Sequence, residues 1–193
     1  MTSQEVLKLY EQTGALLSGH FLLTSGLHSD TYLQSALVLQ HPPYAELLGR
    51  AVAQRFADAR VQVVVGPALG GIIVAHEVAR ALRARALFTE REEGQMRLRR
   101  GFHIQRGERC LVVEDVVTTG GSTREVIGVL EAAGGELVGV GALIDRSGGA
   151  AQFPVKAASL STLSVPNWKP EDCPLCASGR PAVKPGSPGA PTR

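Results

Sequence analysis

The chain has little of what would mark a secreted, membrane or nucleic-acid-binding protein. Three cysteines among 193 residues are too few, and odd in number, for a disulfide framework. Residues 1–5 are polar rather than the apolar core of a signal peptide, and no apolar run approaches the length of a membrane span. The formal net charge is only +2 and the longest basic run is Arg99-Arg100, too little to indicate a nucleic-acid partner. We expect a cytoplasmic protein.

Two nucleotide-binding motifs are also missing. The sequence contains neither a P-loop lysine motif nor a G-x-G-x-x-G that follows a strand, which removes support for an ATPase or a dinucleotide-dependent enzyme. No internal repeat is visible. The length suits one domain with its own hydrophobic core.

The most informative stretch runs from Leu111 to Thr123. Its first half is apolar and β-branched except for Glu114-Asp115, which is typical of a strand buried on both faces of a parallel sheet. Because buried unpaired charge is costly, we expect this acidic pair at the carboxyl edge of the sheet, where open α/β folds bind ligands. The six residues that follow are all small or hydroxylic, and a helix is expected over 124–133, capped by Ser122 with Glu125. The pattern predicts an anion site at a helix N-terminus.

This stretch resembles the phosphoribosyl-pyrophosphate (PRPP) motif of the type I phosphoribosyltransferases. The resemblance implies a mostly parallel central sheet flanked by helices, an α/β fold with a small N-terminal hood. It also implies that the acidic pair contacts the ribose hydroxyls and that the loop holds the 5′-phosphate. The PRPP-binding residues are then Glu114, Asp115, Val116, Val117, Thr118, Thr119, Gly120, Gly121, Ser122 and Thr123.

A second strand–loop–helix unit follows the same logic. Residues 61–66 read as a buried strand and 72–82 as a helix, with Gly70 and Gly71 between them. By resemblance this loop contacts the pyrophosphate of PRPP. Many relatives carry a lysine within it, and Gly70 takes that place here. A plain βα turn that uses glycine for its shape is the alternative.

Residues 19–32 predict a hairpin, with a short strand over 21–23, a turn at Ser25-Gly26 and a second strand over 31–33. The segment resembles the hood that closes over the pyrimidine in orotate phosphoribosyltransferases. Tyr32 would then be an aromatic wall for a flat base. Thr24 is a further candidate contact to the base, although many relatives have a lysine there. A solvated hairpin without a binding role is the alternative.

A strand over 137–144 ends at Asp145-Arg146, and by the same resemblance Arg146 binds the orotate carboxylate, helped by Thr118. The planar guanidinium suits bidentate binding of a carboxylate. A surface pair between Asp145 and Arg146 is the alternative.

The charged, glycine-containing stretch 89–102 predicts an exposed hairpin. In related enzymes this is the lid, often acting on the neighbouring subunit of a homodimer, and its cations balance the pyrophosphate. Arg91 and Arg97 are the catalytic candidates here beside Glu114 and Asp115, with Arg99 and Arg100 as further cations. A solvated charged hairpin is the alternative.

The remaining elements complete a single domain over 1–165, with the hood at about 1–40 and the core at about 41–165. Helices are expected over 3–17 and over 42–56, the latter with Leu47, Leu48, Val52 and Phe56 facing inward, and strands over 84–88 and 158–165. Residues 166–193 read as a Pro/Gly-rich extension. Cys173 and Cys176 form one C-x-x-C in it. A zinc site needs about four ligands and no second cysteine pair exists, so a local turn is favoured over a redox or half-site role.

The implied reaction is transfer of the 5-phosphoribosyl group from PRPP to orotate, giving orotidine 5′-monophosphate and pyrophosphate. The resemblance implies Mg²⁺ carried mainly by PRPP, no resident metal, and a homodimer. Three alternatives stay open. They are a purine or uracil phosphoribosyltransferase, a PRPP-sensing regulatory protein, and an interaction protein linked by zinc through Cys173 and Cys176.

Overall fold

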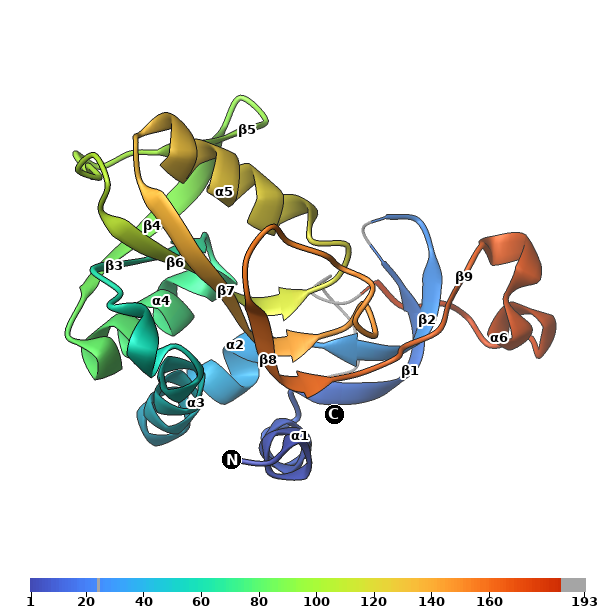
Figure 1. The fold of residues 1–193 in the computed structure, drawn as a ribbon. Helices are drawn as coiled ribbons and strands as arrows, with labels where there is room; N and C mark the ends of the chain where they lie inside the picture. The colour runs from blue at the N-terminus through green and yellow to red at the C-terminus, as the bar shows by residue number, and fades with distance from the viewer. Residues whose placement is uncertain (24, 185–193) are drawn as a thin grey trace.

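The computed structural model describes residues 1–23 and 25–184 and has a six-stranded sheet at its centre (Figure 1). Its strand order is β5-β4-β3-β6-β7-β8. All neighbouring strands run parallel except β5, which is antiparallel to β4. The bounds are β3 (Val63–Pro67), β4 (Arg85–Glu92), β5 (Gln95–Leu98), β6 (Arg109–Val117), β7 (Glu136–Asp145) and β8 (Ala157–Thr162). The expected mostly parallel sheet is confirmed.

Helices cover both faces of this sheet, which explains why its central strands are apolar throughout. On β6, Leu111 and Val113 pack into one core and Cys110 and Val112 into the other, all fully buried. The first core also contains side chains from four helices, and the second contains those of α5 (Gly121–Ala132). The four are α1 (Ser3–Gln12), α2 (Ser35–Leu39), α3 (Pro42–Arg55) and α4 (Gly70–Leu82).

A smaller three-stranded sheet, which we call the hood sheet, stands beside the main one (Figure 1). The predicted hairpin is confirmed with longer strands, β1 (Leu16–Leu22) and β2 (His28–Leu33), and β9 (Asn167–Trp168) pairs with β2 from the far end of the chain. Short helical turns η1 (Ala57–Ala59), η2 (Pro170–Asp172) and α6 (Pro174–Ala177) complete the elements.

Two expectations about helices were wrong. The first helix ends at Gln12 rather than at 17, because Gly14 turns the chain at φ +68° and Leu16 and Leu17 pair with β2. The helix start is well defined, since Thr2 and Glu5 form a capping box. Leu48 and Val52 in α3 and Phe56 directly after it are buried as expected, but Leu47 is 46% exposed. Within the described part of the chain, none of the helices combines the length and apolarity needed to cross a membrane.

Two glycines provide a test of this packing. A Cβ at Gly139 on β7 would lie 2.5 Å from Cε1 of the buried Phe56, whereas a Cβ at Gly128 on α5 would meet nothing within 4 Å. We expect Gly139→Ala to lower the free energy of unfolding by about 1–3 kcal/mol through overpacking. Gly128→Ala should raise it by about 0.5–1 kcal/mol, because alanine favours the helix. Urea denaturation of both variants measures this, and equal effects would contradict the packing described.

Candidate active site

The acidic pair lies at the carboxyl end of β6, as its sequence predicts. Glu114 pairs in register with Ala142 of β7, and its carboxylate accepts a hydrogen bond from the hydroxyl of the fully buried Thr123. Burial raises the pKa of Glu114 to about 7, the Thr123 bond opposes that rise, and the charge of Asp115 adds to it. A carboxylate that titrates near neutrality at a strand end is typical of a functional site.

The second predicted loop, with Gly70 and Gly71, lies directly against Asp115. A Cβ at Gly70 would lie 2.6 Å from the carboxylate atoms of Asp115. Only glycine therefore allows the start of α4 to approach the acidic pair so closely. Gly71 packs as tightly, since its Cβ would lie 2.8 Å from Cδ of Pro67. The Ala68–Leu69 peptide bond in this loop is cis.

The loop after β6 leads directly into α5. Thr118 and Thr119 are exposed, and Gly120 is the N-cap at φ +76°. The expected capping box of Ser122 with Glu125 is wrong. The helix already begins at Gly121 and has no side-chain cap, and Glu125 pairs with Arg91 instead. The N–H of Gly121 donates to Thr119 Oγ1 at 3.4 Å, within the same loop. N–H groups at a helix start attract anions.

Two residues that sequence reasoning missed hold this loop in place. Arg124 donates to the carbonyls of Thr119 at 2.8 Å and Gln152 at 3.2 Å, and its guanidinium lies over the ring of Phe153. A Cβ at Gly120 would come within 2.9 Å of the same ring. The arginine next to the motif was a visible signal, but its partner lies 29 residues further along the chain.

Arg146 reaches from the end of β7 into the hood sheet. Its backbone N–H donates to Val117 at 2.8 Å, and its Nη2 donates to Ser29 Oγ at 3.0 Å and to Asn167 Oδ1 at 3.0 Å. Its Nε is buried and has no partner among the described residues. Burial lowers the pKa of Arg146, and the nearby Asp30 opposes that shift.

The alternative of an Asp145–Arg146 surface pair does not hold. The Asp145 carboxylate accepts bonds from Ser147 and from the N–H of Gly149, and so shapes its own loop. Asn167 had no signal in the sequence, because only the pairing of β9 with β2 brings it to Arg146.

Tyr32, the predicted aromatic wall, is half-buried on β2. Its hydroxyl donates to Gln34 at 3.0 Å and its ring lies 5.7 Å from that of Phe21, between centroids. Thr24, the other predicted base contact in the hood, lies outside the described residues.

The predicted lid is an exposed β4–β5 hairpin. Arg91 forms an ion pair with Glu125 at 2.8 Å, one turn into α5, and Arg97 donates to Gln95 at 3.1 Å. In the part of the chain that the structure describes, neither has a hydrogen bond or ion pair with Glu114 or Asp115. Arg97 also forms an ion pair with Glu92 at 3.7 Å, and the hairpin's other cations pair with carboxylates on the same hairpin, Arg99 with Glu92 and Arg100 with Glu90.

A hollow of about 290 Å³ lies between β7, β8 and the loop after β7. Val117 and Asp145 line one side of it, but neither the acidic pair nor Arg146 does. We therefore place the candidate active site at the strand ends rather than in the hollow.

Comparison with known proteins identifies the family of the chain. The model of the phosphoribosyl transferase domain matches residues 35–176. The orotate phosphoribosyltransferase of Pelotomaculum thermopropionicum is 59% identical over 97% of this chain and 98% of its own, and that of Desulforamulus reducens is 57% identical over the same shares.

Solved structures give the same result. The orotate phosphoribosyltransferase from Aeropyrum pernix superposes with a TM-score of 0.67 at 30% identity, over 82% of this chain and 93% of that one. An adenine phosphoribosyltransferase from Rhodothermus marinus superposes with a TM-score of 0.64 at 22% identity, over 83% of this chain and 99% of that one. At that identity the match supports a common fold and nothing more. The chain belongs to the phosphoribosyltransferase family and, within it, to the orotate phosphoribosyltransferases.

Proposed function

We propose that this protein transfers the 5-phosphoribosyl group from PRPP to orotate at the carboxyl edge of the main sheet. One observation carries the site assignment. The backbone of Arg146 is bonded to the last residue of β6, while its side chain is held by the hood with a buried donor to spare. The guanidinium of Arg146, which suits a planar carboxylate, therefore lies next to the loop after β6, which suits a phosphate.

The PRPP cup works by position and charge. Thr118 to Thr123 hold the 5′-phosphate at the start of α5, and the Gly70–Gly71 backbone approaches the pyrophosphate. Glu114 and Asp115 hold the ribose hydroxyls. Their negative charge stabilises the positive charge that develops on the sugar as the bond from C1 to pyrophosphate breaks. A protein nucleophile is not needed.

The base is oriented by the hood and by Arg146. The Nε–H of Arg146, which has no partner among the described residues, can donate to an oxygen of the orotate carboxylate. Tyr32 covers the flat ring, and Thr118 and Thr24 are further contacts. Purines and uracil lack that carboxylate, so Arg146 selects among bases.

Mg²⁺ is part of this proposal. The carboxylates of Glu114 and Asp115 and the hydroxyls of the loop are hard oxygen donors, which Mg²⁺ prefers when most of its ligands come from substrate phosphates and water. The donor set fits an ion carried mainly by PRPP. When bound, such an ion neutralises the charge of the leaving pyrophosphate.

The lid and the oligomer complete the proposal. Arg91 and Arg97 lie on an exposed hairpin. To reach pyrophosphate, in this subunit or in a neighbour, Arg91 would have to leave Glu125, and Arg97 would have to leave Gln95 and Glu92. We infer a cytoplasmic homodimer. Its interface includes Leu47, Leu69 and Ile73, large apolar side chains that are 46%, 84% and 41% exposed.

The first test compares bases. With PRPP and Mg²⁺, we expect turnover with orotate and none with uracil, adenine or hypoxanthine. Arg146→Ala should raise the KM for orotate about 100-fold, because a charge-assisted bond contributes about 1.5–3 kcal/mol, and should change the KM for PRPP less than about twofold. The control is Arg106→Ala, an exposed arginine that precedes β6 at the opposite edge of the sheet. Equal losses for both substrates would show that Arg146 does not bind the base.

The second test uses pH. Because Glu114 binds ribose as a carboxylate and has a pKa of about 7, kcat/KM for PRPP should fall as the pH drops below 7. The Thr123 hydroxyl favours the charged form, so Thr123→Val should raise the pKa and move the acid limb to higher pH. Protonation of PRPP itself is the same for both proteins and cancels in the comparison. An acid limb that stays in place would rule out Glu114 as its source.

The third test concerns the dimer. Ile73→Lys places a charge on the proposed interface and should raise the dimer dissociation constant at least tenfold. Sedimentation velocity over a concentration series measures this, with Gly128→Ala on α5 as the control. A wild-type protein that is monomeric at all concentrations would refute the homodimer.

A further inference from the structure

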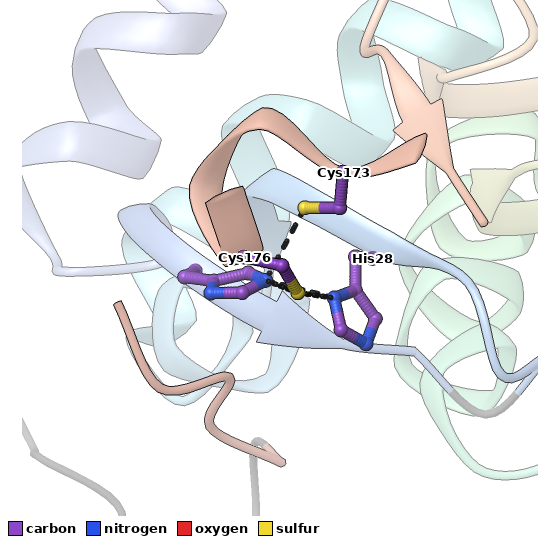
Figure 2. A group of neighbouring side chains, drawn as sticks. His28, Cys173 and Cys176 are labelled. Atoms are coloured by element: carbon purple, nitrogen blue, oxygen red, sulfur yellow. Dashed lines mark hydrogen bonds between the residues drawn. The ribbon is translucent and has the colours of Figure 1, made fainter. Parts of the chain in front are cut away.

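Four potential metal ligands meet where the C-terminal segment crosses the hood. The structure brings together two residues of the hood hairpin and the C-x-x-C pair, with one ligand atom from each within 4.8 Å of the others. We call them the four-ligand cluster: His20, His28, Cys173 and Cys176. Figure 2 shows His28, Cys173 and Cys176 converging on one point. The second ligand pair that the sequence lacked among its cysteines is a pair of histidines eight residues apart.

The distances within the cluster suit one tetrahedral ion. Nε2 of His20 lies 2.8 Å from Nδ1 of His28 and 3.4 and 3.7 Å from the sulfurs of Cys173 and Cys176, and the latter sulfur lies 3.2 Å from Nδ1 of His28. A tetrahedron with Zn–N of about 2.0–2.1 Å and Zn–S of about 2.3 Å has edges of about 3.3–3.8 Å. Opening the 2.8 Å pair of histidine nitrogens and closing the widest pair of ligand atoms, which lie within 4.8 Å, by about 1 Å gives that geometry.

The tautomer of His20 is set for binding. Its Nδ1 lies 2.8 Å from the carbonyl of Arg180, which can only accept, so Nδ1 carries the proton and Nε2 presents a lone pair to the cluster. Both cysteine sulfurs lie around that lone pair. His20, His28 and Cys173 are 6%, 8% and 2% exposed, so three of the four ligands are shielded from solvent.

The surrounding chain has little else to stabilise it. Of residues 166–184, Cys173 alone is buried. Yet the segment is ordered around both edges of the hairpin, with β9 on β2 and with Val183 bonded to Leu22 and to His20. A segment without a core needs a disulfide or a metal to hold its shape, and Cys173 and Cys176 are free thiols.

We propose that the four-ligand cluster binds one structural Zn²⁺ ion that fastens residues 167–183 to the hood hairpin. Two thiolates and two imidazoles that fill all four positions are typical of structural zinc and leave no open position for catalysis. Cys176 is exposed and gives the ion a route in.

The site also bears on the base pocket. His28 adjoins Ser29, and both pair with β9; Ser29 and Asn167 are two of the groups that hold Arg146. Zinc would thus fix the acceptors around Arg146, and its loss should raise the KM for orotate more than that for PRPP. This part rests on the proposed function, whereas the metal content does not.

The test measures metal in the full chain, purified without a histidine tag or chelator. We expect one zinc per chain by mass spectrometry, and less than about a tenth of that in Cys173→Ser/Cys176→Ser. The controls are Cys110→Ala and His103→Gln, a buried cysteine and an exposed histidine outside the cluster, which should keep their zinc. A chelator should lower the Tm of the wild type by several degrees and leave the double variant unchanged.

The native chain provides a readout that does not depend on how the variants fold. After exchange with Co²⁺, a tetrahedral site with thiolates should give strong d–d bands and a sulfur-to-cobalt charge-transfer band. The proposal is overturned by wild-type protein without stoichiometric zinc, by a Cys173–Cys176 disulfide in fresh protein, or by full zinc in the double variant. An enzyme that turned over no base but bound one zinc would refute the proposed function and keep this site.

Discussion

The burial of β6 on both faces is the constraint on which the rest of the structure depends. A strand with helices on both sides has no solvent-facing side, so a carboxylate is tolerated only near its end. Even there, burial raises the pKa of Glu114 to about 7. Thr123 offsets part of that cost from the first turn of α5. The acidic pair, the loop and the helix start are thus one unit, in which each part is needed to accommodate the others.

Close backbone approach is the second consequence. The start of α4 lies so near to Asp115 that no side chain fits at Gly70, and Gly120 lies so near to Phe153 that the same holds there. The lysine that many relatives carry in the first loop could not occupy position 70 without moving the acidic pair. In the function proposed above, the amide groups of the backbone, fixed by packing, would supply the positive potential in this loop.

Those parts of the candidate site that depend on local sequence patterns could be predicted. A buried strand, an acidic pair and a run of small residues have only one arrangement in a parallel sheet, so β6, its loop and α5 were predictable, as was the hairpin of the hood. The failures have a common cause. Helix α1 ends early because β2 offers Leu16 a partner, and Glu125 leaves its expected cap because Arg91 reaches it from β4. Asn167 and the two histidines depend on how the C-terminal segment folds back, which no spacing encodes.

In the function proposed above, the fold of the C-terminal segment would separate two tasks, the binding of phosphate and the selection of one base. The cup is built within one strand–loop–helix unit and needs nothing from the termini. The guanidinium of Arg146, in contrast, is held by Ser29 from the hood and by Asn167 from the C-terminal segment. A buried arginine keeps its direction only if its acceptors are fixed, because its planar donors lose their value when misaligned. In the function proposed above, base selection would therefore depend on how firmly a segment with almost no core is fastened to the hood. The ion inferred at the four-ligand cluster would fasten it without contact to the phosphate loop.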